Sequence, residues 1–207
     1  MQLRDPTHLY EGEISPRTKR IAQIISFFAQ APFISIPVFI LLCMQADTVS
    51  DIVLFSAISI FFATLVPTVV VMIIAKRTGN EDVDIVRRED RMVPLAIGTL
   101  SYLLGTVILY AIDSPRIVWV AMLCYCINTV VIMLITTKWK ISIHATGCVG
   151  PSMALAYVFG WQGGLLIIIL PVVVYCRYVL RKHTPAQLAA GALLGFMLTG
   201  ILFILLL

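Results

Sequence analysis

Long apolar runs, separated by short polar segments, constrain this chain more than any other feature of its sequence. Most of the runs reach the roughly twenty residues that a helix needs to cross a hydrocarbon core of about 30 Å. No charged residue lies deep within a run. The runs cover residues 21–44, 51–75, 92–112, 117–137, 145–160, 163–180 and 186–207. The sequence therefore predicts an all-α, polytopic transmembrane bundle of six to seven helices.

The composition excludes a soluble domain. Of the 207 residues, 60% are hydrophobic and only 13% are charged, which is more apolar surface than a soluble chain of this length could bury. We expect a polar tail over residues 1–20 and a single transmembrane domain over residues 21–207. The run 145–160 is short and contains Pro151, which leaves open whether it crosses the bilayer completely.

Basic residues flank the apolar runs and gather on one side of them. The formal net charge is +4, but this placement indicates orientation in a membrane rather than nucleic-acid binding. When successive connections alternate between the two sides, fourteen of the fifteen Lys and Arg residues fall on one side and only Arg116 on the other. By the positive-inside rule the basic side is cytoplasmic. We expect a multi-pass protein of the cell membrane with its N-terminus in the cytoplasm.

The cysteines do not form a recognisable framework. There are five of them, and neither their odd number nor their spacing is typical of disulfide pairing or of a zinc site. The sequence also lacks a Walker phosphate loop, a dinucleotide fingerprint and a zinc-protease helix. We therefore expect no metal and no cofactor.

Two histidines stand out on the basic side. His144 and His183 each lie in a different connection close to basic residues, and a third connection carries Arg87, Arg88 and Arg91. Guanidinium groups match phosphoryl oxygens, and an imidazole can attack phosphorus or protonate a leaving oxygen. This combination favours phosphate chemistry. Spacing alone leaves open an ordinary cytoplasmic face, on which basic residues only set the orientation.

Local patterns around these residues resemble a known family. Arg177, five residues, His183, three residues and Gln187 resemble the third motif of the type 2 phosphatidic acid phosphatase family, which reads Ser-Arg, five residues, His, three residues, Asp. The segment Ile141-Ser142-Ile143-His144 resembles the second motif, Pro-Ser-Gly-His. Residues 88–94 look like a loose form of the first motif. The three patterns follow the family's order and span about residues 84–195.

The resemblance implies a helix bundle of that family's kind and a role for each matched residue. His183 would attack the phosphorus and become a phosphohistidine, and His144 would protonate the leaving oxygen. The phosphoryl oxygens would be held by basic residues, with help from a serine: Arg177, Arg88, Arg91, Lys140 and Ser142. The activity implied is the metal-independent removal of phosphate from a lipid phosphate or diphosphate, of the polyprenyl or glycerolipid type.

Gln187 is the main departure from the family pattern. The family's Asp would fix the tautomer of the nucleophilic histidine and stabilise its cation, whereas a Gln carbonyl orients the ring without supplying charge. The segment from Thr184 to Gln187 also reads as a capping box that opens a helix. A helix N-terminus beside His183 favours an anion and disfavours an imidazolium, which suits a neutral nucleophile.

Two other functions stay open on the sequence alone. The first is a catalytically impaired member of the same fold that binds or moves a phospholipid, which the change at Gln187 favours. The second is a small membrane transporter, for which only scattered polar groups such as Asn128 offer a path. The partners expected in the leading case are a lipid phosphate and the bilayer, without nucleic acid; a homo-oligomer is compatible with the sequence.

Overall fold

The computed structural model describes residues 14–77 and 91–207, and this part of the chain is all-α. The N-terminal helices are α1 (Pro16–Phe28), α2 (Ala31–Cys43), α3 (Val49–Ile60), the π-helical turn η1 (Phe61–Leu65) and α4 (Val66–Arg77). After the gap follow α5 (Met92–Ala111), α6 (Arg116–Thr136), α7 (Ile143–Gly164), the 3-10 turn η3 (Leu165–Ile168), α8 (Ile169–Val179) and α9 (Pro185–Leu206).

The chain is a multi-pass membrane protein. Five helical segments are long and apolar enough to cross a bilayer, or six if the bent pair α1 and α2 is counted as one span. The two helices of that pair meet at an angle of 44°. The sequence predicted six to seven helices. The difference arises mainly at the predicted runs 145–160 and 163–180, which together form one helical stretch, Ile143–Val179.

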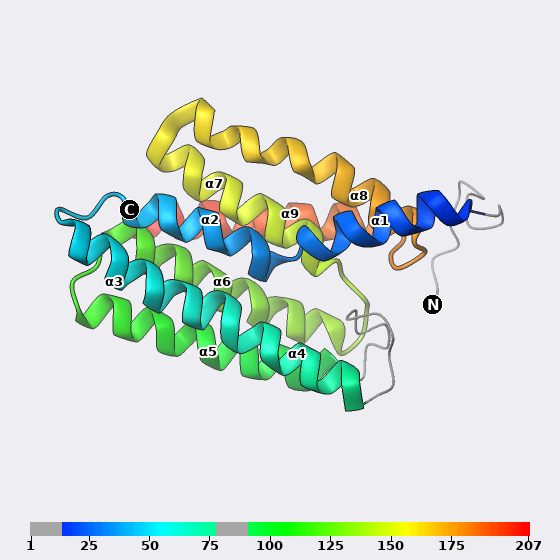
Figure 1. The fold of residues 1–207 in the computed structure, drawn as a ribbon, viewed down its shortest axis with the longest axis horizontal. Helices are drawn as coiled ribbons and strands as arrows, with labels where there is room; N and C mark the ends of the chain where they lie inside the picture. Colours follow the sequence, from blue (N-terminus) through cyan, green and yellow to red (C-terminus); the bar gives the residue numbers. More distant parts are fainter. Residues whose placement is uncertain (1–13, 78–90) are drawn as a thin grey trace.

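The stretch Ile143–Val179 reverses direction within its length. Its backbone leaves helical geometry at Gly160, where φ is 61° and ψ is −144°. A positive φ of this kind suits glycine, which has no Cβ to clash with the backbone. Figure 1 shows the consequence: α8 runs back along α7, and the two helices are in contact. The two predicted runs are therefore the two arms of a helical hairpin.

The remaining helices pack around α6 and α7. α5 packs along α6, α9 packs against both α6 and α7, α2 packs between α3 and α7, and α1 lies against α8. Bulky side chains such as Leu42, Leu109 and Met122 are completely buried between these helices. The outer faces carry exposed Leu, Ile, Val and Phe side chains, as expected where lipid is the solvent.

The basic residues of the described chain gather at one end of the bundle. That end, on the right in Figure 1, holds the start of α1, the end of α4, the start of α5 and the α6–α7 and α8–α9 connections. The opposite end carries Arg116, at the start of α6. The basic residues at the first end are Arg17, Lys19, Arg20, Lys76, Arg77, Arg91, Lys138, Lys140, Arg177, Arg181 and Lys182. The one-sided charge expected from the sequence is therefore present in the fold.

Candidate functional site

His144 is positioned by the beginning of α7. Ser142 is the N-cap of this helix, and its hydroxyl oxygen accepts a hydrogen bond of 3.3 Å from the backbone N–H of Ala145. His144 therefore lies in the first turn, and its side chain is only 8% exposed. Ser142 itself is completely buried. The capping role of Ser142 explains why a serine suits this position, since its side chain satisfies a backbone donor that the helix leaves without a partner.

His183 is positioned by the turn between α8 and α9. The N–H of Arg181 donates to the carbonyl of Tyr178 (2.8 Å), and the N–H of Lys182 donates to the carbonyl of Arg177 (3.1 Å). Arg181 adopts a φ of 56°. These bonds and this left-handed residue form a Schellman motif, which ends a helix and turns the chain sharply. The turn places His183, 2% exposed, directly before Thr184, the N-cap of α9.

Gln187 both caps α9 and contacts His183. The predicted capping box is confirmed: the Thr184 hydroxyl oxygen accepts from the N–H of Gln187 (3.4 Å), and Oε1 of Gln187 accepts from the N–H of Thr184 (3.2 Å). The same Oε1 lies 3.3 Å from Nδ1 of His183. An amide oxygen only accepts, so this contact selects the tautomer in which Nδ1 carries the proton. The lone pair then resides on Nε2.

Backbone contacts join the segments of the two histidines. The N–H of Ser142 donates to the carbonyl of Gln187 (3.2 Å), and the hydroxyl of Thr146 donates to the carbonyl of Gly191 (2.8 Å). A Cβ at Gly191 would collide with the carbonyl oxygen of Ser142. The absence of a side chain at Gly191 therefore allows α9 to approach the start of α7 closely.

Two buried arginines surround His183. Arg177, 2% exposed, donates from Nη1 to the hydroxyl oxygen of Ser26 in α1 (2.9 Å). Arg91, 5% exposed, is the N-cap residue of α5. Burial, and after it the nearby positive charges of Arg177, Arg91 and Lys140 and the imidazole of His144, lower the pKa of His183 to about 2. His183 is therefore neutral at physiological pH in a strongly positive environment.

A cavity of about 140 Å³ opens beside the histidines. This is far more than the roughly 10–15 Å³ that one water molecule needs by the same measure. His144, His183 and Arg91 line it together with residues at the start of α2 and α5, among them Gln30, Pro32, Pro94 and Leu95. The cavity thus lies at the N-terminal ends of α2, α5 and α7, next to the N-terminus of α9. Each of these ends presents partial positive charge.

The structure brings together the sequence-predicted site residues that it describes. Arg177, Arg91, Lys140 and His144 lie close enough to lower the pKa of His183, Gln187 contacts its ring, and Ser142 caps the helix that carries His144. Arg88 lies outside the described residues. Within the described ranges, no group of three or more His, Cys, Asp or Glu side chains is arranged to hold a metal ion.

Sequence reasoning missed the contributions of α1 and of the α1–α2 bend. Ser26 contacts Arg177, and Gln30 lines the cavity. Both residues lie in an apolar stretch and have no motif around them. Residues at the bend between α1 and α2, Gln30 among them, line the same cavity as the two histidines.

Comparison of the chain with models of known protein families, with curated proteins and with solved structures found no match. The motif residues and their arrangement therefore carry the functional argument.

Proposed function

We propose that this protein is a membrane phosphohydrolase that removes phosphate from a lipid phosphate or diphosphate through a phosphohistidine intermediate. The observation that carries the proposal is the meeting of His183, His144 and Arg91 on one cavity, with Arg177 buried beside them. The three motif segments that resemble type 2 phosphatidic acid phosphatases supply these residues. Their convergence supports membership of that family, although the segments are far apart in the sequence.

The electrostatics of the cavity favour an anion. Burying two arginines is costly unless an opposite charge or good hydrogen bonds compensate. The N-terminal ends of α2, α5 and α7 add partial positive charge at the same place. A phosphoryl group would provide several acceptor oxygens for the guanidinium groups and the nearby backbone N–H groups. The site has no need of a metal ion to neutralise a phosphate, because the arginines supply the positive charge.

In the first step, Nε2 of His183 attacks phosphorus and forms a P–N bond. The bond from phosphorus to the lipid oxygen breaks, and His144 donates a proton to that oxygen as the lipid leaves. Oε1 of Gln187 keeps the proton of His183 on Nδ1, so that Nε2 offers its lone pair. Arg177 and Arg91 stabilise the charge that accumulates on the equatorial oxygens.

In the second step, water hydrolyses the phosphohistidine. His144, now neutral, takes a proton from the attacking water, and the new P–O bond forms as the P–N bond breaks. Inorganic phosphate leaves with the site restored. His144 therefore acts first as an acid and then as a base, as one group must when the second step resembles the reverse of the first.

The proposed site lies at the membrane surface. Arg91, His144, Arg177 and His183 belong to the start of α5, the start of α7, the end of α8 and the α8–α9 connection, which Figure 1 shows at the basic end of the bundle. A lipid headgroup would meet them there while its tail stays among the helices. By the positive-inside rule this end faces the cytoplasm. The lipid that is dephosphorylated is then in the cytoplasmic leaflet.

Phosphate release by purified protein tests the proposal. We expect wild-type protein to release phosphate from lipid phosphates in EDTA, and His183→Asn and His144→Asn to reduce release at least 100-fold. Lys19→Gln, which removes an exposed basic residue from the same end, is the matched control and should retain activity. Activity that survives both histidine substitutions would overturn the proposal.

The neutral side chain at position 187 favours a second candidate function, binding of a lipid phosphate without turnover. A glutamine supplies no charge to stabilise a histidine cation. In that case the wild-type protein would bind a lipid phosphate with an affinity that depends on Arg177 but not on the nucleophilicity of His183. Tight binding without phosphate release, unchanged in His183→Asn, would favour this candidate over the phosphohydrolase.

A further inference from the structure

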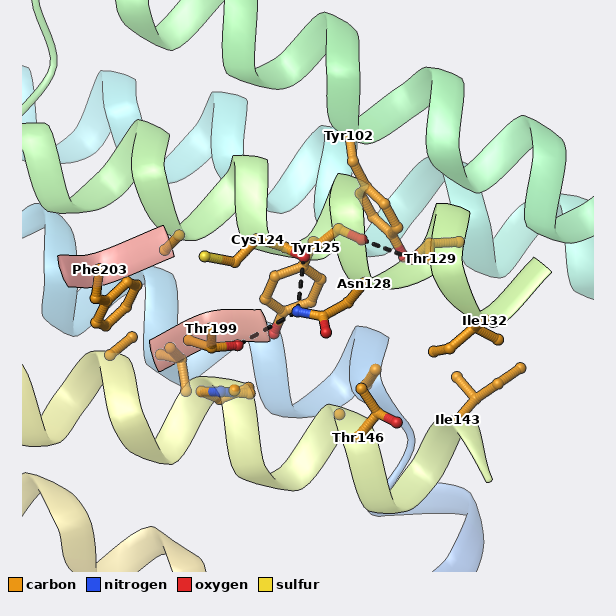
Figure 2. A pocket seen from close by; sticks show the side chains of 17 residues that line it. Tyr102, Cys124, Tyr125, Asn128, Thr129, Ile132, Ile143, Thr146, Thr199 and Phe203 are labelled. Carbon is orange, nitrogen blue, oxygen red and sulfur yellow. Dashed lines mark hydrogen bonds between the residues drawn. The ribbon is translucent and has the colours of Figure 1, made fainter. Parts of the chain in front are cut away.

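A second cavity of about 60 Å³ lies deeper in the bundle, among α2, α5, α6, α7 and α9. Most of its lining is apolar, but six residues with hydroxyl or amide side chains also line it: Tyr102, Tyr125, Asn128, Thr129, Thr146 and Thr199. We call this second cavity the chamber. Figure 2 shows Asn128 near its middle, with Phe203 toward one end and Ile132 and Ile143 toward the other. Polar side chains are expensive inside a membrane protein and mark functional positions.

Two polar atoms of the chamber have no protein partner in the described chain. The amide nitrogen of Asn128 donates to the carbonyl of Cys124 (2.8 Å) and to the hydroxyl of Thr199 (3.3 Å). Its Oδ1 and the hydroxyl of Tyr125 are buried and have no hydrogen-bond partner within residues 14–77 and 91–207. Leaving such a buried group without a partner is unfavourable, because it has lost its hydrogen bonds to water. A ligand that donates a hydrogen bond to Oδ1 of Asn128 and accepts one from the Tyr125 hydroxyl would give both atoms a partner.

The chamber adjoins the histidine cavity. Ala31, Tyr102, Thr129 and Ile143 line both cavities. The position of the chamber relative to His144 can be estimated along α7. Gly150 of this helix faces Thr199, whose hydroxyl accepts a hydrogen bond from Asn128. Gly150 follows His144 by six positions along this helix, which corresponds to about 9 Å at 1.5 Å per residue.

We propose that the chamber is the subsite for the glycerol region of a glycerolipid phosphate that carries a free hydroxyl. This inference rests on the proposed function. With the phosphate at His183 and His144, an extended glycerolipid places its hydroxyl and ester groups below the phosphate in the direction of the chamber. The lipid hydroxyl donates to Oδ1 of Asn128, and the Tyr125 hydroxyl donates to an ester oxygen. A prenyl chain has only carbon and hydrogen at this depth and leaves both protein atoms unsatisfied.

The physical consequence is a preference between the two lipid classes that the sequence left open. A site built to hydrogen-bond a substrate hydroxyl rejects an analogue that lacks it, because buried polar groups are then left without partners. The glycerolipid supplies hydrogen-bond partners to Asn128 and Tyr125 on binding, whereas the prenyl lipid cannot.

Binding of two non-hydrolysable phosphonates tests the subsite without requiring turnover. The probes are a monoacylglycerol phosphonate with a free hydroxyl and geranylgeranyl phosphonate, each titrated calorimetrically into full-length protein in detergent. We expect wild-type protein to bind the glycerol compound at least tenfold more tightly. Tyr125→Phe removes one hydroxyl and should reduce this preference, and Asn128→Leu should abolish it, while the affinity for geranylgeranyl phosphonate stays constant. Tyr110→Phe, on an exposed tyrosine of α5, is the control.

The outcomes separate the subsite from the catalytic proposal. Equal wild-type affinity for the two phosphonates, or an equal loss on both in the variants, overturns the subsite and makes the chamber a water-filled structural cavity. Because Asn128→Leu removes a buried hydrogen-bonding group, the smaller change Tyr125→Phe decides the question if the leucine variant does not fold. A clear preference in phosphonate binding without phosphate release from any lipid supports the subsite and overturns the phosphohydrolase instead.

Discussion

At the scale of single residues, Gln187 determines the hydrogen bonding of the His183 ring. Its Oε1 accepts a hydrogen bond from the backbone N–H of Thr184. This bond identifies the atom as the oxygen and excludes the flipped orientation of the amide. The same oxygen therefore accepts from Nδ1 of His183. One side chain thus begins α9 and sets the tautomer of the proposed nucleophile. An aspartate or glutamate would add a negative charge, which glutamine lacks.

Gln187→Glu should accelerate phosphate release. The carboxylate keeps the length of the glutamine side chain and hence the capping box, and it stabilises the positive charge that His183 acquires when it attacks. We expect kcat to rise about tenfold, which corresponds to about 1.4 kcal/mol of barrier. Gln187→Ala is the matched control, and should lose activity together with about 1 kcal/mol of stability from the cap. A glutamate variant that binds substrate normally and is no faster would contradict this account.

The stability of the fold should decrease as the pH falls below about 6.5. The folded pKa of His183 is lowered to about 2 by burial and by basic neighbours, so only the unfolded chain takes up this proton between those values. The expected loss is up to about 1.4 kcal/mol for each pH unit. Unfolding in detergent at pH 7.0 and pH 5.5 measures it, in a range above the titration of most carboxylates. His183→Asn should show a smaller dependence, and an unchanged slope would contradict the assignment.

At the scale of helices, the sequence predicted those features that depend on neighbouring residues. The capping box at Thr184 and Gln187 was recognised because all of its partners lie within four positions. The break near Gly160 was visible as a boundary between two apolar runs. In the structure the two runs form one helical stretch that folds back on itself at this break. The contact of Ser26 with Arg177 could not be predicted, because 151 positions separate the two residues and no local pattern links them.

Gly191→Ala should destabilise the protein, because the new methyl group would meet the carbonyl oxygen of Ser142. Overpacking of this kind costs about 1–3 kcal/mol. Gly200→Ala in the same helix is the control, since its methyl group would meet only the flexible end of Met153 at 3.4 Å. Alanine is the better helix former, so the control should be neutral or more stable by about 0.5–1 kcal/mol. Equal unfolding midpoints for the two variants would show that the α7–α9 contact relaxes easily.

At the scale of the whole molecule, one end of the bundle carries both the positive charge and the candidate site. The alternation of connections could be counted from the sequence, and it placed His144 and His183 on the same face correctly. The cavities could not be predicted, because they arise where α2, α5, α6, α7 and α9 meet. Their shapes depend on helix packing, which is not encoded in any single segment. Only the positive-inside rule indicates which side of the membrane the basic end of the bundle faces.

Thiol labelling should show that the basic end lies in the cytoplasm. The five native cysteines are buried, so a single introduced cysteine provides the signal. Thr137→Cys, in the α6–α7 connection, should react with a membrane-impermeant maleimide only after cells are opened. Asp47→Cys, in the α2–α3 connection at the other end, should react in intact cells. The reverse pattern would place the site outside the cell and overturn the orientation.

The hydrogen bond between Ser26 and Arg177 can form only late in synthesis, because 151 positions separate the two residues. Membrane insertion follows synthesis from the N-terminus, so α1 enters the bilayer long before α8 exists. Until α8 has been made, the Ser26 hydroxyl has no Arg177 guanidinium from which to accept a hydrogen bond, and α1 has no α8 to pack against. A nascent chain that has been made only as far as α6 therefore contains neither half of the histidine pair and no closed cavity. The proposed binding of a lipid phosphate therefore becomes possible only late in biogenesis, after α8 has folded back along α7.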